Sequence, residues 1–265
     1  MQKFKNLIWE YYREHKRALP WRRTKDPYKI LVSEVMLQQT QVSRVLIKYE
    51  KFIKNFPSFK ILSRASNRDV LSAWQGLGYN RRALNLSKTA QIVVENYNGR
   101  LPNNPKILET FPGVGKATAN AVCAFAFNQP TIFIETNIRR VFIHHFFKDK
   151  DKVSDRKILP YVSQSVDHNN PREWYFALMD FGTMLGRLKG NANRKSMHYA
   201  KQSPFEGSNR RLRGIILREL LAKPQLQRKE VYDKIGYDKK RVKEIFSSLV
   251  SDGFLQEKSG WYSIK

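Results

Sequence analysis

The segment that decides the fold reads Leu108-Glu109-Thr110-Phe111-Pro112-Gly113-Val114-Gly115-Lys116-Ala117-Thr118-Ala119-Asn120. Its pattern predicts that one helix ends, a Pro-Gly-Val-Gly turn follows, and a second helix of small residues begins. Glycines at both ends of the turn allow positive φ and a close approach of the backbone to a ligand. The N–H groups at the start of the second helix then form an anion site. An ordinary helical corner would need only the glycines, whereas the complete pattern favours a phosphate site formed by Gly113, Val114, Gly115, Lys116 and Thr118.

The charge of the chain favours a polyanionic partner. Its 265 residues include 49 Lys+Arg against 23 Asp+Glu, a formal net charge of +26. A phosphate backbone binds such a basic surface favourably, because binding releases the counterions condensed on the phosphates. Because the basic residues are spread along most of the sequence, charge alone leaves open a soluble cationic protein or a protein of the membrane surface. Hydrophobic residues make up 41%, which is enough for a real core.

A single cysteine, Cys123, lies in an apolar stretch and is predicted to be a buried structural thiol. One cysteine excludes a disulfide framework and a cysteine-based metal or iron–sulfur site, so we expect no metal and no cofactor. The N-terminal stretch lacks the apolar core of a signal peptide. No run of about 18 apolar residues occurs, so no membrane span is predicted. We therefore expect a protein of the prokaryotic cytoplasm, associated with the nucleoid and not secreted.

Helices are predicted for most of the sequence before Gly186. Apolar residues recur there at three- and four-residue spacing, and short connections rich in Pro and Gly separate the runs. Two such runs are Phe4, Leu7, Ile8, Tyr11 and Val45, Leu46, Tyr49, Phe52. No long alternating strand pattern interrupts them. The expected fold class is therefore mainly α.

The C-terminal part of the chain is predicted to be a separate module. A strongly basic connector leads into helices at Leu212–Leu221, around Lys229–Ile235 and at Lys239–Ser251, followed by a hairpin of residues 254–258 and 261–264. This order resembles a winged helix, in which the third helix would carry Lys239, Lys240, Arg241 and Lys243 toward DNA. A small protein-docking module is the alternative. The expected domains are residues 1–185, a connector at 186–207 in the place of a cluster loop, and the winged-helix-like domain at 208–265.

Five blocks of sequence resemble the helix-hairpin-helix (HhH-GPD) DNA glycosylases, and among them the MutY-type adenine DNA glycosylases. The resemblance covers about residues 1–185 and implies a glycosylase domain of two helical lobes. Its most specific block is the run from Ser33 to Val42. The blocks are residues 19–22, residues 26–42, residues 74–79, the hairpin quoted above, and residues 177–182.

The resemblance also implies roles for individual residues. Glu34 falls on the family's catalytic glutamate. Gln39 falls on the residue that wedges into the base stack, and Tyr79 on an intercalating tyrosine. Such side chains are physically expected, because flipping a base out of the duplex costs a few kcal/mol of unstacking. The base pocket would be formed by Trp21, Arg22, Ala117 and Asn137.

The chemistry of Glu34 can also be argued from its neighbours. Asp26 is a good N-cap residue and Pro27 suits the first helical position. Helical spacing then places Ile30, Glu34 and Leu37 on one face. A carboxyl group among apolar neighbours has a raised pKa, which suits a general acid that protonates a leaving purine. A glutamate on a solvated helix face is the structural alternative.

Glu135 is the second candidate catalytic carboxylate. It precedes a helix that Thr136 or Asn137 is expected to cap, so the positive end of the helix dipole should keep it ionised. One neutral acid and one charged carboxylate would together cleave a glycosidic bond through a cationic sugar. A carboxylate placed only to stabilise the helix is the alternative.

Three departures from the family pattern limit the inference. Most members have aspartate at the position of Glu135, so the carboxylate here is one methylene longer. The four cluster cysteines are absent, and Gly186 stands about where the first would be, so a clusterless protein is expected. The family's C-terminal domain, which reads 8-oxoguanine, is replaced by the winged-helix-like segment.

The expected activity is that of a monofunctional DNA N-glycosylase. Bifunctional relatives have a nucleophilic lysine at the position of Ala117, whereas Lys116 lies one residue earlier, so no AP-lyase step is expected. The expected partner is double-stranded DNA with a mispaired or damaged base, bound by a monomer. The leading substrate is adenine opposite 8-oxoguanine or guanine. Thymine, uracil or another damaged base opposite guanine is one alternative, and a catalytically silent DNA-binding protein is another.

Overall fold

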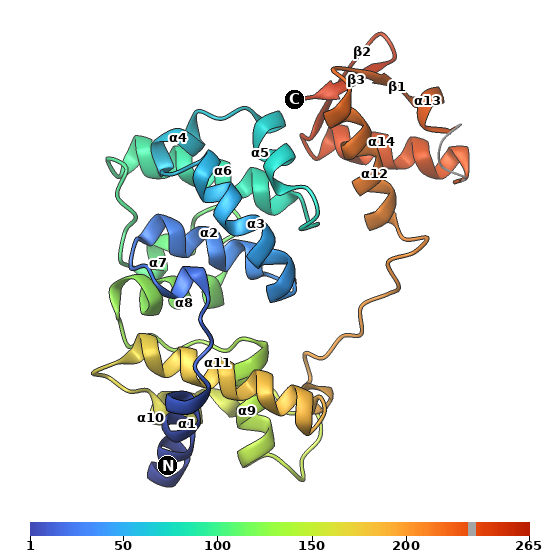
Figure 1. Cartoon of the computed structure of the whole chain (residues 1–265). Helices are drawn as coiled ribbons and strands as arrows, with labels where there is room; N and C mark the ends of the chain where they lie inside the picture. The colour runs from blue at the N-terminus through green and yellow to red at the C-terminus, as the bar shows by residue number, and fades with distance from the viewer. Residues whose placement is uncertain (233–236) are drawn as a thin grey trace. The chain divides into compact units, whose positions relative to one another are not determined.

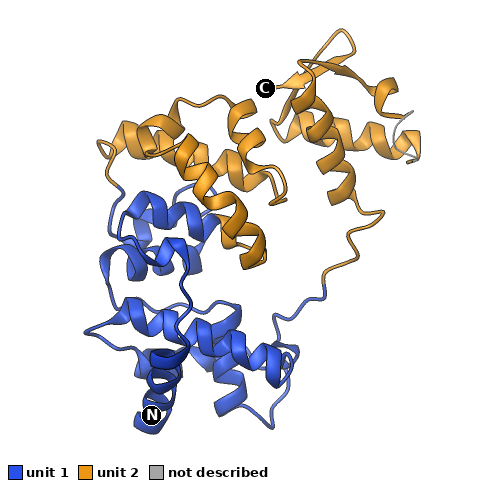
Figure 2. Ribbon diagram, viewed as in Figure 1, with its two compact units in different colours: residues 1–35, 101–201 blue, residues 36–100, 202–265 orange. Residues whose placement is uncertain are grey.

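The structure is a computed structural model that describes residues 1–232 and 237–265. The chain forms two compact units, drawn in separate colours in Figure 2. Unit 1 comprises residues 1–35 and 101–201, and unit 2 comprises residues 36–100 and 202–265. The predicted N-terminal domain, residues 1–185, therefore contributes to both units. Within the described residues, no helix has the length and apolar character needed to cross a bilayer.

Unit 1 is helical, as Figure 1 shows. Its elements are α1 (Gln2–His15), the 3₁₀ turn η1 (Pro20–Arg22), most of α2 (Pro27–Leu37), α7 (Pro105–Leu108), α8 (Lys116–Phe127), α9 (Thr136–Phe146), α10 (Asp155–Ser165), α11 (Pro171–Leu188) and the 3₁₀ turn η2 (Ala192–Lys195).

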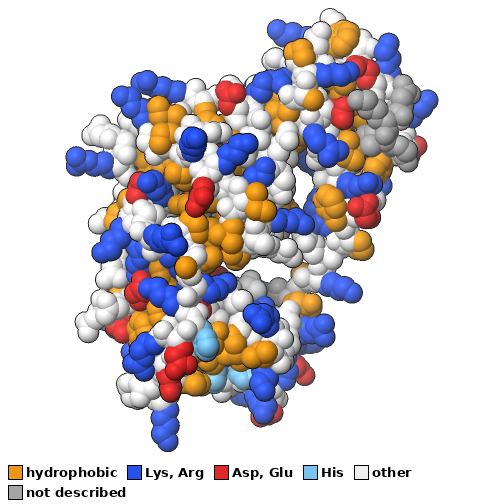
Figure 3. Space-filling model, viewed as in Figure 1, with side chains coloured by type: hydrophobic (Ala, Val, Ile, Leu, Met, Phe, Trp, Pro, Cys, Tyr) orange, Lys and Arg blue, Asp and Glu red, His pale blue; other side chains and the backbone are white. Residues whose placement is uncertain are grey.

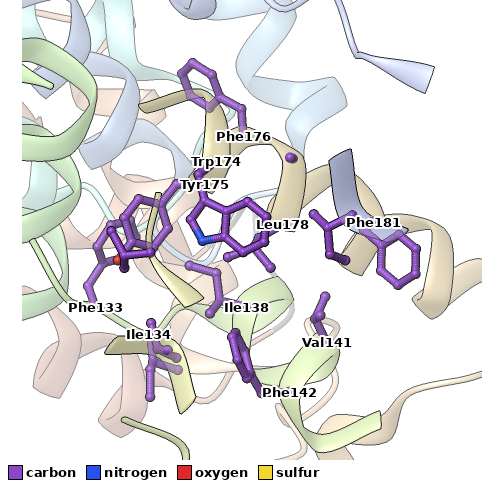
Figure 4. Close-up of a cluster of buried hydrophobic side chains, with 14 of the residues drawn as sticks. Phe133, Ile134, Ile138, Val141, Phe142, Trp174, Tyr175, Phe176, Leu178 and Phe181 are labelled. Carbon is purple, nitrogen blue, oxygen red and sulfur yellow. The ribbon is translucent and has the colours of Figure 1, made fainter. Parts of the chain in front are cut away.

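The core of unit 1 lies between α9 and α11 (Figure 4). Trp174 and Tyr175 of α11 are fully buried, beside Ile138 and Phe142 of α9. Burying large aromatic side chains is among the strongest contributions to a core. This core fixes the N-terminal end of α9, where Glu135 lies. Cys123 is buried in α8, as predicted, and burial raises the pKa of its thiol to about 11.

Two glycines of α11 let it approach α9 closely. A Cβ atom on Gly182 would lie 2.5 Å from the carbonyl oxygen of Asn137, and one on Gly186 would lie 2.8 Å from Nη1 of Arg140. The first obstacle is backbone, whereas the second is the end of a flexible side chain. Gly182 is therefore the more stringent requirement for bringing the two helices together.

Unit 2 contains a second helical group and the C-terminal module. The helical group is α3 (Val42–Asn55), α4 (Phe59–Ser63), α5 (Asn67–Trp74) and α6 (Arg81–Asn96). The module is α12 (Asn209–Ala222), β1 (Leu226–Gln227), α13 (Arg228–Tyr232), α14 (Lys239–Ser251), β2 (Leu255–Lys258) and β3 (Trp261–Ile264).

The C-terminal module has the predicted three helices and hairpin. Helix α14 has the predicted bounds, and its apolar side chains Val242, Ile245, Phe246 and Leu249 are buried. The sheet has the order β1-β3-β2, and both pairs are antiparallel. The short strand β1 was not predicted, since two residues carry no periodic signal. Helix α13 ends at Tyr232, and the rest of the predicted Lys229–Ile235 helix lies outside the described residues.

The module contacts the helical group of the same unit through arginines. Arg68 of α5 donates hydrogen bonds to the carbonyl oxygens of Leu221, Lys223 and Pro224 at 3.1–3.2 Å. Arg81 at the start of α6 forms a 2.8 Å ion pair with Asp252. The hydrogen bonds from Arg68 satisfy carbonyl groups at the C-terminal end of α12, where orphan backbone groups need partners.

The connector differs from its predicted bounds. Helix α11 continues past Gly186 to Leu188, η2 follows, and α12 already begins at Asn209. The connector was placed from Gly186 because the sequence becomes strongly basic there, and the end of α11 was therefore missed. Lysine and arginine are in fact good helix formers.

Candidate active site

Glu34 lies on a helix that is buried on most sides. Asp26 caps α2 as predicted, accepting a 2.9 Å hydrogen bond from the N–H of Tyr28. Its neighbours Ser33 and Val35 are buried, and Glu34 itself keeps part of its surface open to solvent. Burial raises the pKa of its carboxyl to about 8, the charge of Glu135 adds to the rise, and Arg22 opposes it. Near neutral pH, Glu34 is therefore a proton donor that a ligand can reach.

Glu135 is itself the N-cap of α9, which corrects the expectation that Thr136 or Asn137 fills this role. Its backbone is extended (φ −117°, ψ 179°), and Oε1 accepts hydrogen bonds from the N–H groups of Asn137 (2.7 Å) and Ile138 (2.8 Å). The longer side chain reaches back over the first turn and leaves Thr136 exposed.

Opposing influences act on the carboxyl of Glu135. Burial raises its pKa above the usual range, and the two backbone N–H groups, Arg139 and Arg140 offset only part of that rise. Among the described residues, no backbone N–H group lowers the pKa of Glu34 in this way, and the charge of Glu135 raises that pKa further. Of the two carboxyl groups, Glu135 is therefore the one with hydrogen-bond donors that favour its ionised form.

A network around Asn137 holds the start of α9 in place. Nη1 of Arg140 donates to Oδ1 of Asn137 (2.8 Å) and to the carbonyl oxygen of Gly182 (2.7 Å). Nδ2 of Asn137 lies 3.3 Å from Oε2 of Glu135. Asn137 therefore orients Glu135, and its side-chain oxygen is occupied by Arg140.

The hairpin forms the predicted turn, with one correction. Gly113 has a positive φ of 76°, whereas Gly115 has an ordinary φ of −85° and is the N-cap of α8 without any side-chain cap hydrogen bond. A Cβ atom on Gly115 would meet no protein atom within 4 Å. The fold therefore does not require glycine there, which leaves room for a ligand to approach. Lys116 and Ala117 are exposed beside it, Thr118 is half-buried, and Val114 is buried in support of the turn.

Gln39 and Tyr79 share an unusual backbone conformation in unit 2. Both have positive φ, 50° and 48°, although neither is glycine. Both are exposed, and Tyr79 exposes 39% of its surface. Left-handed conformations of ordinary residues store strain and cluster at functional sites. The backbone conformation and the exposure of both side chains leave them accessible to a ligand, and their role as wedge residues stays a prediction.

Arg82 joins the loops that carry Gln39 and Tyr79, and sequence reasoning missed it. Its buried guanidinium donates hydrogen bonds to carbonyl oxygens on both loops and to Oγ1 of Thr40 (2.9 Å). The carbonyl acceptors belong to Met36 (2.8 Å), Gln38 (2.7 Å), Leu77 (3.2 Å), Gly78 (3.0 Å) and Tyr79 (3.4 Å). An arginine in a basic sequence carried no signal that it would be buried.

Comparison with known proteins agrees with these observations. Residues 32–161, which include Glu34, the hairpin and Glu135, match the HhH-GPD superfamily of base excision DNA repair proteins. The chain belongs to this superfamily.

Relatives of this HhH-GPD protein include curated adenine DNA glycosylases. One from Buchnera aphidicola subsp. Baizongia pistaciae is 39% identical over 188 residues, covering 70% of this chain and 52% of the relative. One from Mycobacterium tuberculosis is 44% identical over 137 residues, covering 51% and 45%. The chain thus spans about half the length of these relatives.

A solved structure of a thermostable thymine-DNA glycosylase is also similar to this HhH-GPD protein. The TM-score is 0.65 at 28% identity, with 73% of this chain and 91% of that chain covered. The chain is therefore similar to DNA glycosylases in the arrangement of its helices as well as in sequence.

Trp21 and Arg22 were predicted to line the base pocket, and the side chains of both are buried in unit 1. Trp21 is buried. The Arg22 side chain is 4% exposed, and both of its terminal nitrogens lie 2.8 Å from the Asp180 carboxylate. Its guanidinium also lies over the ring of Phe176, 4.4 Å from the centroid. Asp180 was missed as a functional residue, although a lone carboxylate in the apolar block 177–182 was a usable signal.

The segment that follows α11 is held by hydrogen bonds. Nδ2 of the buried Asn193 donates to the carbonyl oxygen of Thr136 (2.9 Å), next to Glu135. Backbone bonds also join Val153 to Lys195 (2.8 Å) and to Met197 (3.0 Å). The one cysteine of the sequence is buried in α8, so the residues present do not fit an iron–sulfur cluster, whose ligands are cysteine thiolates.

Proposed function

We propose that this protein is a DNA N-glycosylase of base excision repair that removes adenine mispaired with 8-oxoguanine or guanine. The single observation that carries the proposal is the pair of carboxyl groups: burial raises the pKa of Glu34 to about 8, and two backbone N–H groups donate hydrogen bonds to Glu135 that favour its carboxylate form. The names of the curated relatives support adenine as the excised base.

In the proposed reaction, a duplex binds to the hairpin at Gly113–Thr118 and the target nucleotide flips out of the stack. Gln39 and Tyr79 fill the vacated space. Glu34 donates its proton to the purine, the C1′–N9 bond breaks, and its electron pair leaves with the base. The carboxylate of Glu135 stabilises the cationic sugar until water attacks C1′. The water then passes one proton to the Glu34 carboxylate, which restores the acid.

We further propose that the enzyme acts as a monomer, is monofunctional and works without an iron–sulfur cluster. Ala117 occupies the position of the lyase nucleophile, and Lys116 lies one residue earlier on the first turn of α8. Borohydride treatment of the enzyme with substrate is therefore expected to trap no covalent complex with DNA, and a trapped complex would show that a lysine attacks the sugar.

A second candidate substrate is thymine opposite guanine. It is favoured by the similarity to the thymine-DNA glycosylase structure and by the small, exposed Ala117, which excludes neither base. A panel of duplexes with A or T opposite 8-oxoguanine or guanine, incubated and then cleaved with alkali, distinguishes the candidates. Abasic sites only on A-containing duplexes support the proposal, and sites only on T-containing duplexes support the second candidate. Sites on none of them would contradict both candidates.

A further inference from the structure

The C-terminal module contributes to a cavity in unit 2, and apart from Gln39 and Tyr79 its lining has no role in the proposed reaction. The cavity encloses about 710 Å³, and one wall is formed by α12. The other wall contains residues of α3, α5, α6 and the loops with Gln39 and Tyr79. We call it the arginine groove, because seven arginines line it against one carboxylate, Asp252.

The charges of the arginine groove do not cancel. Asp252 is paired with Arg81 (2.8 Å) and Arg213 (2.6 Å). Arg44 on α3 and Arg218 on α12 are exposed and have no acidic partner in the part of the chain that the structure describes. Arg210 donates to neutral oxygens of Tyr79 and Ser203. The net positive charge of both walls suits a polyanion. By contrast, Figure 3 shows Lys and Arg side chains spread over the face in view and not gathered in one patch.

A glycine in the middle of α12 indicates that something approaches this wall closely. Gly214 lines the arginine groove and is exposed, and a Cβ atom added to it would meet no atom of the described residues within 4 Å. Glycine inside a helix is less favourable than alanine. Since the fold gives no steric reason for it, the open space above Gly214 is available to a ligand.

The groove also carries side chains that can stack on bases. Tyr79 and Gln39 line it with their strained backbones, and Phe205 lines it while 58% exposed. Cationic walls with exposed aromatic rings are typical of sites that bind a nucleic acid strand without reading its sequence.

We propose that the arginine groove binds the sugar–phosphate backbone of a DNA strand beside the wedge residues, so that α12 is a DNA-contacting face of the C-terminal module. This assignment differs from the sequence-based expectation, which placed DNA contact on α14. Lys240 and Lys243 of α14 are exposed, while Arg241 is occupied by Asn209 (2.8 Å) and the carbonyl oxygen of Gly207 (2.6 Å). The choice of DNA as ligand rests on the proposed function.

The test compares binding of the full chain to an undamaged labelled duplex, measured by fluorescence anisotropy over a range of salt concentrations. Such a duplex contains no substrate base, so the result does not depend on excision. The variants are Arg218→Ala, which removes one groove charge, and Gly214→Leu, which fills the groove without changing charge. Lys243→Ala on α14 is the matched control. Thermal unfolding checks each fold, and leucine is expected to favour α12 because it is a better helix former than glycine.

Arg218→Ala is expected to weaken binding about eightfold at 0.1 M salt and to reduce the slope of log K against log salt by about 0.9, the effect of one lost phosphate contact. Gly214→Leu is expected to weaken binding by about fivefold or more, because the leucine side chain blocks the close approach of the DNA backbone to α12.

Lys243→Ala should bind like the wild type. The proposal is wrong if the first two variants bind within twofold of the wild type, or if Lys243→Ala loses as much as Arg218→Ala. The duplex panel is run in parallel, so inactivity toward mispairs would overturn the proposed function while the binding result still decides the groove.

Discussion

Replacing Glu34 by glutamine is expected to stabilise the protein while abolishing its proposed chemistry. The pKa of Glu34 rises from 4.5 to about 8 in the folded protein, because the carboxyl is buried beside Glu135. Between these pH values the unfolded chain has an ionised carboxylate and the folded protein a neutral acid. Folding therefore takes up a proton, and wild-type stability is lost as pH rises from 4.5 through 8.

The size of this effect follows from the shift. Each pH unit inside the window costs about 1.4 kcal/mol. From pH 4.5 to pH 7 the loss is at most about 3 kcal/mol, and roughly 2 kcal/mol is expected because part of the side chain is open to solvent. Glutamine has nearly the shape of the neutral acid and does not titrate. The advantage of Glu34→Gln in free energy of unfolding should therefore be about zero near pH 4.5 and grow to about 2 kcal/mol at pH 7.

Urea unfolding of the wild type and of Glu34→Gln at pH 5, 7 and 8.5 measures this difference directly. The control is Glu109→Gln, which removes an exposed carboxylate and should change stability by less than about 0.5 kcal/mol at each pH. If the Glu34→Gln advantage is the same at every pH, the carboxyl does not have a raised pKa and the reasoning is refuted.

Three further variants test other parts of the site. Glu135→Gln keeps an oxygen that caps α9 but removes the charge, so stability should change by less than about 1 kcal/mol while single-turnover excision slows about 100-fold or more; a rate within threefold of the wild type would contradict an electrostatic role. Gly182→Ala should cost about 2–3 kcal/mol in urea unfolding, because its Cβ meets backbone at Asn137, whereas Gly186→Ala meets only the movable end of Arg140 and should cost less than about 1 kcal/mol. Equal costs would show that the contact at Asn137 does not set the approach of the helices. Arg82→Lys leaves several carbonyl acceptors without donors, so the unfolding free energy should fall by about 2 kcal/mol and excision should slow as the loops of Gln39 and Tyr79 loosen. Unchanged stability would mean that Arg82 does not hold these loops.

The features that could be predicted from the sequence are those encoded by neighbouring residues. Asp26 and Pro27 mark the start of α2, and the apolar spacing of α14 fixes both of its ends. The hairpin was predictable for the same reason, since turn and helix start lie within a few residues. The resemblance to the HhH-GPD glycosylases identified Glu34 and Glu135 as the candidate catalytic residues.

The missed features depend on segments that are distant in sequence. Arg82 binds carbonyl groups more than forty positions away, and Asp180 binds Arg22 across 158 positions. The N-cap of α9 was assigned to the wrong residue because the cap depends on side-chain length and backbone conformation. The side chain of Glu135 is long enough to accept hydrogen bonds from the first turn of α9 when its backbone is extended, as it is here. Local propensity does not contain such information.

The central claim is that Glu34 acts as the general acid of a glycosylase, and one paired measurement tests it most directly. Adenine excision from a duplex with adenine opposite 8-oxoguanine is followed under single-turnover conditions at saturating enzyme, with wild type and Glu34→Gln side by side, and DNA binding is measured in the same samples. We predict that the wild type forms alkali-labile sites at a rate that falls above about pH 8, and that Glu34→Gln forms none while it binds the duplex with nearly unchanged affinity. A Glu34→Gln rate equal to that of the wild type would contradict the assigned role, and so would a wild type that forms no abasic site.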